Sequence, residues 1–75
     1  MENEFVQSLE DKKPKAIRDY VSHTRSAINA YNLSMESMAN LDINELNKYL
    51  MKASERGNCA TGWRHYLRFL IAVRD

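Results

Sequence analysis

The sequence predicts an all-α fold. Apolar residues recur at helical spacing in several segments, and no stretch alternates apolar and polar residues as a half-exposed strand would. The 75-residue chain contains only two glycines and one proline, so few positions interrupt a helix. A chain of this length forms one domain and buries about 60% of the surface that its unfolded form exposes. We therefore expect a single small domain in which helices pack around one core.

The first helical patterns lie on either side of Pro14. Residues 3–11 place Phe5, Val6 and Leu9 on one helical face, which predicts either a short helix or a lead-in arm over residues 1–12. Pro14 suits the first turn of a following helix, because proline has no N–H to leave unpaired there. The helix predicted over residues 14–31 has one apolar stripe. That stripe consists of Ile17, Tyr20, Val21, Thr24, Ile28 and Tyr31.

A second stripe on the same helix is polar and carries no acid. We call it the α-row, and it consists of Lys15, Arg18, Ser22, Arg25 and Asn29. Asp19 lies off it. The α-row is about 21 Å long, from a rise of about 1.5 Å per residue. Lysine and arginine contribute a salt-dependent attraction to phosphates, and serine and asparagine supply positioning hydrogen bonds.

The middle of the chain predicts a connection and then a second strong helix. Residues 32–41 form the connection, with one helical turn over 35–39, and we expect Met38 and Leu41 to fill the core. Asp42 and Glu45 have the spacing of a capping box at the start of a helix over 42–56. Gly57 then occupies the C′ position, where glycine adopts a positive φ at little cost.

A last helix is predicted over residues 61–74, with Thr61 as its N-cap. One side carries Trp63, Tyr66, Leu67, Leu70 and Ile71, and another groups Arg64, His65 and Arg68. Phe69 and Val73 widen its apolar surface. No glycine or proline ends this helix, so we expect the 75 residues to be a piece of a longer protein.

The charge is unevenly distributed, although the net charge is only +1. Residues 1–11 carry −4, residues 12–31 carry +4 and residues 57–75 carry +2. This asymmetry favours a side of the domain that faces a polyanion. The single cysteine, Cys59, excludes an internal disulfide and is typical of an intracellular protein. We find no signal peptide and no run of about 20 apolar residues that would span a membrane.

Two segments carry a resemblance to a known family. "AIRDYVSHTRSAIN" matches at Ile17 and Tyr20, and "LDINELNKYL" follows a segment pattern that family members often show. A loop with Gly57 and a last helix with Arg64, Leu67, Arg68 and Phe69 come next in the family's order. Over residues 13–73 the chain resembles the N-terminal core-binding domain of tyrosine recombinases, the phage-integrase family. It departs from the family at Ala16, where threonine is usual, and at Trp63, where an aliphatic residue is usual.

The resemblance implies a compact four-helix bundle with the SAM-like orthogonal arrangement. It implies that residues 13–75 bind double-stranded DNA at a core site, as half of a clamp whose other half is a catalytic domain that this chain lacks. The chain itself would not be an enzyme. Such a domain belongs to a phage or mobile-element integrase in the bacterial cytoplasm, associated with DNA. Full recombinases assemble as tetramers on DNA, and we expect this chain alone to be monomeric.

The predicted DNA-binding residues come from the helix over 14–31, its basic lead and the helix over 61–74. They are Lys12, Lys13, Lys15, Arg18, Ser22, Arg25, Asn29, Thr61, Arg64, His65 and Arg68. We expect no catalytic residue, metal or cofactor, because His23, His65 and Cys59 fall in no metal-binding or nucleophile motif. The four tyrosines are expected to be core aromatics whose hydroxyls reach water.

Two other functions remain open from the sequence. A SAM-like or death-like protein-interaction module would use Phe69, Val73 and the segment with Phe5, Val6 and Leu9 as its partner surface. A helix-turn-helix regulator would use the helices over 42–56 and 61–74, but its recognition helix would have to expose Trp63 or Phe69. The acid-free α-row favours DNA binding over the protein-interaction module.

Overall fold

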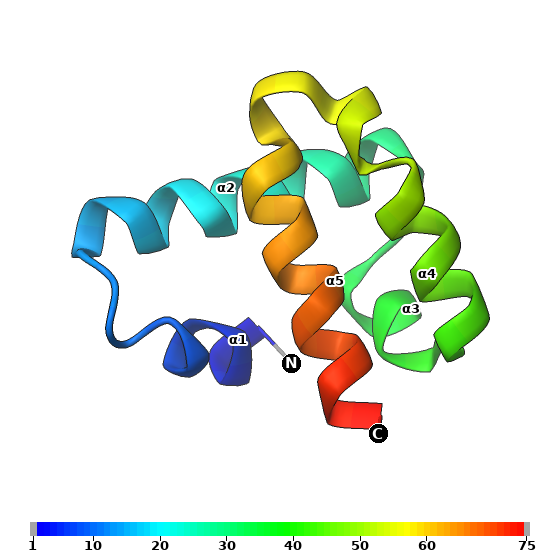
Figure 1. Ribbon diagram of the computed structural model, residues 1–75, viewed down its shortest axis with the longest axis horizontal. Helices are drawn as coiled ribbons and strands as arrows, with labels where there is room; N and C mark the ends of the chain where they lie inside the picture. Colours follow the sequence, from blue (N-terminus) through cyan, green and yellow to red (C-terminus); the bar gives the residue numbers. More distant parts are fainter. Residues whose placement is uncertain (1, 75) are drawn as a thin grey trace.

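The computed structural model describes residues 2–74 and confirms the all-α prediction (Figure 1). Within this range the backbone forms five α-helices, one 3₁₀ segment and no strand. The elements are α1 (Glu2–Ser8), α2 (Pro14–Ala30), α3 (Met35–Asn40), α4 (Ile43–Met51), η1 (Ala53–Cys59) and α5 (Ala60–Arg74). Four of the helices follow residue 13, and α1 adds a fifth before it.

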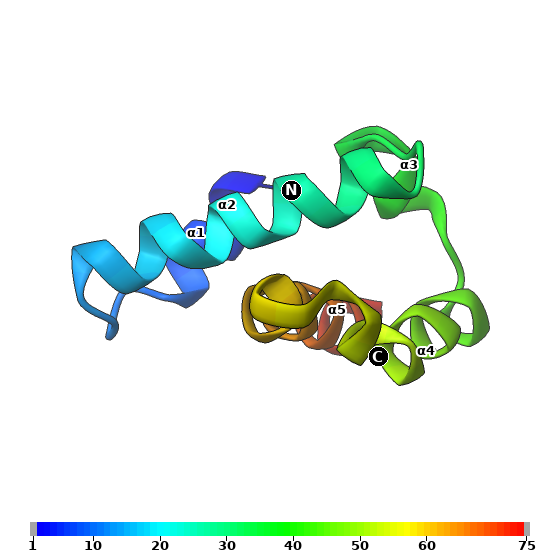
Figure 2. The ribbon, with the colours of Figure 1, turned by 90° about the horizontal axis from the view of Figure 1, so that it is seen from above.

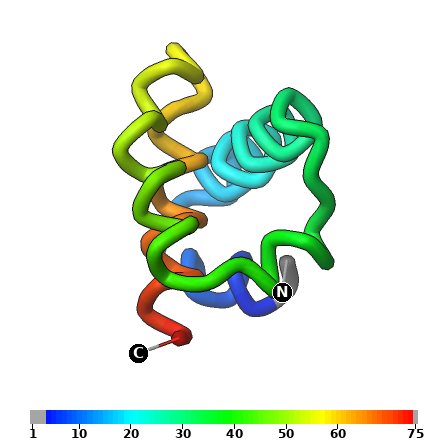
Figure 3. Tube along the Cα trace, turned by 90° about the vertical axis from the view of Figure 1, so that its right-hand side faces the viewer, coloured from blue at the N-terminus to red at the C-terminus, as the bar shows by residue number. Residues whose placement is uncertain are grey.

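Helix α5 is the centre of the molecule. It crosses α2, with which it makes its most extensive contact, and it also packs against α4 and η1. Seen from above, α4 and α5 form one layer and α1, α2 and α3 form the other (Figure 2). A third view shows η1 at one end of the molecule, where it returns the chain from α4 to α5 (Figure 3). Helices α1, α2 and α4 thus all pack against α5.

Aromatic side chains fill the core. Trp63 and Tyr66 of α5 have no exposed surface. The Trp63 ring lies 6.2 Å from the rings of Tyr31 and Tyr49 and 6.3 Å from that of Tyr66, measured between centroids. The expectation that tyrosine hydroxyls reach water is wrong for Tyr66, whose hydroxyl lies 3.9 Å from the sulfur of Met35. Met38 is fully buried, as predicted.

The N-terminal segment is part of this core and is a helix, not an arm. Phe5 and Leu9 are buried. The Phe5 ring meets Tyr66 edge-on at a centroid distance of 5.0 Å and lies 5.6 Å from Phe69. Helix α1 thus covers the part of the apolar surface of α5 that carries Tyr66 and Phe69.

The ends of α4 and α5 differ from the prediction in two places. The Asp42 carboxylate caps α4 and accepts from the Glu45 N–H at 2.8 Å, as predicted. Helix α4 then ends at Met51 and not at residue 56. The stretch "SERGN" that follows Ala53 has no apolar residue to bury against the core, and Ala53 itself is fully buried at the start of the tighter 3₁₀ segment.

The chain reverses at Gly57, inside η1. Its φ of 58° and ψ of −121° are those of the first central residue of a type II′ turn, which favours glycine. Gly57 therefore has the predicted positive φ but is not the C′ residue of α4. Helix α5 begins at Ala60, which is buried and already helical, so Thr61 lies in the first turn and is not the N-cap.

The crossing of α2 and α5 depends on Gly62. A Cβ atom built on Gly62 would lie 2.6 Å from the Cβ of His23 and 2.8 Å from both the Cα and the carbonyl oxygen of Tyr20. Two of these three neighbours are backbone atoms, which cannot move aside as a flexible side chain would. The hydroxyl of buried Thr24 donates to the Tyr20 carbonyl at 2.8 Å and lies 3.4 Å from the Gly62 carbonyl. Glycine is therefore required where the two helices touch.

We expect Gly62→Ala to destabilise the protein by about 1–3 kcal/mol, the usual range for overpacking a tight contact. An exposed helix position would respond in the opposite sense, because alanine is favoured over glycine there by about 1 kcal/mol. Urea unfolding followed by circular dichroism measures the change. Ala72→Gly, at an exposed position of α5, gives the propensity effect alone. Equal or greater stability of Gly62→Ala would contradict the close crossing.

Phe5→Ala tests whether α1 belongs to the core. We expect a loss of about 3–5 kcal/mol in the free energy of unfolding, the usual cost of removing a buried phenylalanine. Gln7→Ala, an exposed substitution on the same helix, is the matched control. A change of less than about 1 kcal/mol for Phe5→Ala, within the scatter of ordinary substitutions, would mean that α1 contributes little to the fold.

Candidate nucleic-acid interface

The α-row lies on the outer surface of α2. All five of its side chains are exposed. Tyr20, His23 and Thr24, which meet Gly62 of α5, lie on the opposite side of the same helix, since successive residues turn by about 100° around the axis. The structure therefore keeps the α-row together and turns it away from α5.

The residues predicted on α5 form a separate group, which we call the α5 group. Its members are Thr61, Arg64, His65 and Arg68. Thr61 and Arg68 are exposed, and Arg64 and His65 are half-buried. By helical position, Thr61, Arg64 and Arg68 point away from the side of α5 on which Gly62 meets α2. The α-row on α2 and Arg64 and Arg68 on α5 thus face away from the contact between the two helices, whereas His65 turns toward Tyr20 of α2.

The two lysines before α2 are exposed and lie at the end of the connection from α1. Lys13 is the N-cap residue of α2 and its side chain makes no capping hydrogen bond. Lys12 is close enough to α5 for its charge to act on the pKa of His65.

His65 is held in place by Tyr20. The two rings are stacked at a centroid distance of 4.6 Å and an interplanar angle of 19°. Burial lowers the pKa of His65 from its ordinary value, and the positive charges of Lys12 and Arg68 lower it further. The folded protein therefore favours the neutral imidazole. The sequence showed the adjacency of Arg64 and His65, but nothing in it indicated Tyr20 as a platform.

A hollow borders one end of the α-row. It has a volume of about 270 Å³ and lies between the end of α2 and the start of α3. Arg25 and Asn29 of the α-row line it together with Ser34, over the apolar side chains of Ile28, Leu33 and Met35. The α-row is thus a surface with a recess at its C-terminal end.

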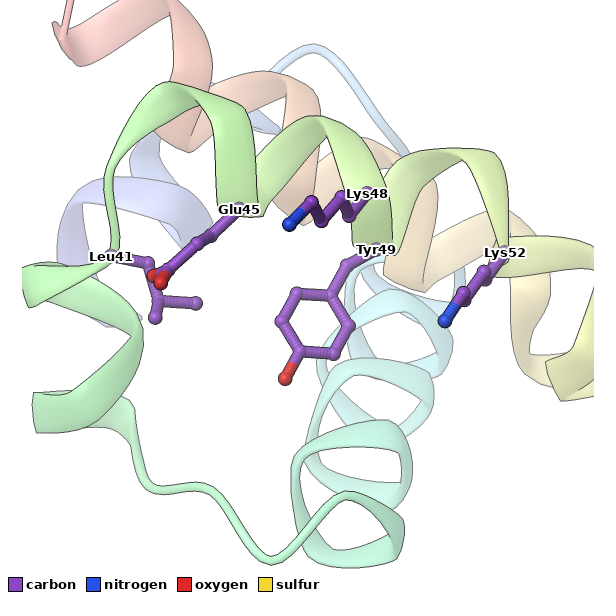
Figure 4. A pocket seen from close by; sticks show the side chains of 5 residues that line it. All are labelled: Leu41, Glu45, Lys48, Tyr49 and Lys52. Carbon is purple, nitrogen blue, oxygen red and sulfur yellow. The ribbon is translucent and has the colours of Figure 1, made fainter.

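A second pocket lies on α4 and was not identified from the sequence. It has a volume of about 320 Å³ and is lined by Leu41, Glu45, Lys48, Tyr49 and Lys52 (Figure 4). Lys48, Tyr49 and Lys52 come three, four and seven residues after Glu45, a spacing that places all four on one helical face. This spacing can be seen in the sequence. The polar part of the lining consists of one acid, two amines and a phenol.

Glu55 and Arg56 have a structural role in η1. The Arg56 guanidinium carbon lies 5.1 Å from the centroid of the Tyr31 ring, within the range of a cation–π contact. The Tyr31 hydroxyl donates to a Glu55 carboxylate oxygen at 3.3 Å. Burial and the Glu55 charge raise the pKa of Tyr31, and Arg56 opposes them. These contacts fasten η1 to the end of α2.

Metal-binding clusters and membrane-spanning helices are both missing from the part of the chain that the structure describes. No three His, Cys, Asp or Glu side chains there are grouped so that they would hold a metal ion. No helix within residues 2–74 has the length and apolar content that crossing a bilayer requires. Cys59 of η1 and His23 of α2 are both half-buried, and the Cβ of His23 packs against Gly62.

Comparisons with protein-family models, with curated proteins and with solved structures found no match for this chain. The fold and the position of each residue are therefore the basis for a functional proposal.

The lowered pKa of His65 predicts a pH-dependent stability. Between the folded and the ordinary pKa of this group the unfolded state binds more protons, so the free energy of unfolding falls as the pH falls. We expect His65→Gln to flatten the decline that urea unfolding measures between about pH 8 and about pH 5. His23→Gln, which removes the chain's other imidazole, should leave His65's part of the decline in place. An unchanged decline in His65→Gln would be inconsistent with the lowered pKa.

Proposed function

We propose that this chain binds double-stranded DNA through the α-row, mainly by contacts to backbone phosphates. The observation that carries the proposal is the row itself, which presents five exposed basic or neutral polar side chains along one face of α2. Asp19 is the only acidic residue within that helix and lies beside the row, not in it. A solvated helix face has no physical reason to exclude acids, whereas a face directed at a polyanion does.

The chemistry of the α-row suits a phosphate backbone. Its length of about 21 Å, from the rise per residue, spans several successive phosphates of one strand, which advance about 3.4 Å each along the duplex axis. Lys15 and Arg18 supply charge at one end, and Arg25 and Asn29 lie beside the recess at the other. Arginine pairs with guanine and asparagine with adenine when they reach base edges, so any base contact is expected at this second end.

The biological setting that we propose rests on the resemblance to the core-binding domain of tyrosine recombinases. The apolar positions that carry the resemblance have the burial of core residues: Leu46 and Leu67 are buried, and Ile17, Tyr20 and Phe69 pack against the core. The proposed role is binding, with catalysis, tetramer assembly and the second half of the clamp supplied by a separate catalytic domain. The α-row is the proposed DNA surface, and Arg64 and Arg68 lie outside it.

The interaction-module hypothesis receives less support from the structure. Phe5 and Leu9, which would form half of its partner surface, are buried in the core. Phe69 lies against Phe5 of α1, and Val73 alone of the larger side chains proposed for that surface is well exposed. The helix-turn-helix hypothesis meets a similar objection, because Trp63 in its recognition helix has no exposed surface.

DNA binding is measured by fluorescence anisotropy of a labelled random duplex at salt concentrations from about 50 to about 200 mM, where phosphate contacts weaken strongly. We expect Lys15→Gln/Arg18→Gln to weaken binding about fivefold or more at low salt. We also expect the slope of log affinity against log salt to become smaller by up to about 1.8, because each phosphate that is no longer neutralised reduces it by about 0.9.

The matched control is Lys48→Gln/Lys52→Gln, which removes the same charge from α4 and its C-terminal end. Both variants are compared with the parent by circular dichroism before titration. Equal binding by the two variants would assign any affinity to overall charge and not to the α-row. Absence of binding at low salt, up to high micromolar protein, would overturn the proposed function.

A further inference from the structure

The recess at the C-terminal end of the α-row is built on a helix end with a fixed backbone. The chain leaves α2 through Asn32, whose φ of 57° lies in the left-handed region. The Leu33 N–H donates to the Ile28 carbonyl at 2.9 Å, and the Asn32 N–H donates to the Asn29 carbonyl at 3.1 Å. These two bonds form a Schellman motif, in which the residue after the turn packs back on the last turn of the helix. Leu33 and Ile28 accordingly line the recess together.

The wall of the recess on the side of α3 is fixed as well. The Ser34 hydroxyl caps α3 and accepts from the Ser37 N–H at 3.0 Å. Met35, which also lines the recess, follows in the first turn of α3 and is half-buried. Hydrogen-bonded turns thus hold both walls in place, so a ligand does not have to order them when it binds.

The recess combines an apolar floor with polar side chains from the α-row. Ile28, Leu33 and Met35 supply the apolar part, and Arg25 and Asn29 line it from α2. The Asn29 side chain is exposed, and an asparagine amide offers an acceptor and two donors in one plane. The volume of about 270 Å³ lies just below the range of about 300–1,000 Å³ that is usual for drug-sized ligands. The recess therefore suits a ligand with one flat ring system and hydrogen-bonding groups at its edge.

The charges around the recess favour a ligand whose negative end lies toward α2. Arg25 is the charged residue among those that line the recess, and residues 25–35 contain no acid. The nearest acid in the sequence is Glu36 on α3, which is exposed and does not line the recess. Glu55 approaches the end of α2 from η1, where its carboxylate accepts from the Tyr31 hydroxyl. A neutral ring in the recess with an anionic group toward Arg25 fits this distribution of charge.

We propose that the recess binds one adenine nucleotide, with the base on the apolar floor, its edge on Asn29 and its phosphate toward Arg25. A base outside a stack is held by apolar side chains and read at its edge. Asparagine pairs with N6 and N7 of adenine, which selects this base. The nucleotide is either an unpaired residue of a DNA strand or a free mononucleotide. With DNA as the source, the inference rests on the proposed function, because the α-row then holds the neighbouring phosphates.

DNA as the source is tested by fluorescence anisotropy with four labelled duplexes of one sequence. One is fully paired, and the others carry an unpaired adenine, an unpaired thymine or an abasic nucleotide at the same position. The last three share the same break in the stack, so they differ only in the base that they offer. We expect the adenine duplex to bind about fivefold or more tightly than the thymine and abasic duplexes, the lower end of what one bidentate base contact contributes.

Variants separate the recess from the α-row. Asn29→Ala removes the amide from an exposed position of α2 and should abolish the preference for the unpaired adenine. The matched control is Asn47→Ala, an exposed asparagine of α4, which should keep the preference. Lys15→Gln/Arg18→Gln should weaken all four duplexes alike and leave the preference unchanged, because these charges act on phosphates that every duplex has. Circular dichroism verifies that each variant is folded.

A free mononucleotide as the source is tested by NMR with AMP, and inorganic phosphate is the control. The side-chain amide signals of Asn29 are assigned by their loss in Asn29→Ala. We expect them to move with AMP and to stay in place with phosphate.

Each outcome decides the proposal. A preference for the unpaired adenine that Asn29→Ala abolishes supports the site with DNA as the source, and a shift specific to AMP supports it with the free nucleotide as the source. Equal binding of the adenine, thymine and abasic duplexes together with no shift specific to AMP overturns it. A gain that thymine shares with adenine, or that persists in Asn29→Ala, overturns it as well. If none of the duplexes binds, the proposed function fails, and the AMP titration alone decides the recess.

Discussion

The close approach of Gly62 to the backbone of Tyr20 is the contact on which the remaining structure depends. It allows α5 to cross α2 with the carbonyl of Tyr20 only 2.8 Å from where a Cβ would lie. A larger residue at 62 would hold the two helices apart along their most extensive contact. Trp63 and Tyr66, which follow Gly62 on α5, are fully buried.

The same crossing determines where the basic residues lie. Because Tyr20, His23 and Thr24 face α5, the α-row must face outward on the far side of α2. Because Gly62 faces α2, Arg64 and Arg68 must face outward on α5. His65 lies between these directions and stacks on Tyr20. One packing contact thus turns the α-row and the pair Arg64 and Arg68 in different directions, and the α-row is the proposed DNA surface.

Features set by neighbouring residues were predictable from the sequence, and features set by helix crossing were not. Helical spacing identified α2 and the exposure of Lys15, Arg18 and Asn29, and the Asp42 cap depends on residues three apart. The early end of α4 was missed because burial of Ala53 outweighs the capping preference of Gly57, a competition decided by the core. Nothing in the local sequence shows that α2 and α5 cross at Gly62, because a glycine within a helical pattern looks the same whether it faces another helix or solvent.

The candidate site illustrates the same limit for charge. Helical spacing establishes which residues share a face of one helix, but it leaves open how that face is turned relative to a second helix. The α-row and Arg68 were therefore expected to act together, whereas the crossing turns them in different directions. With a net charge of only +1, attraction of the whole protein to a polyanion is weak. Any selective binding must then come from such local groups, and their composition is decided by tertiary packing.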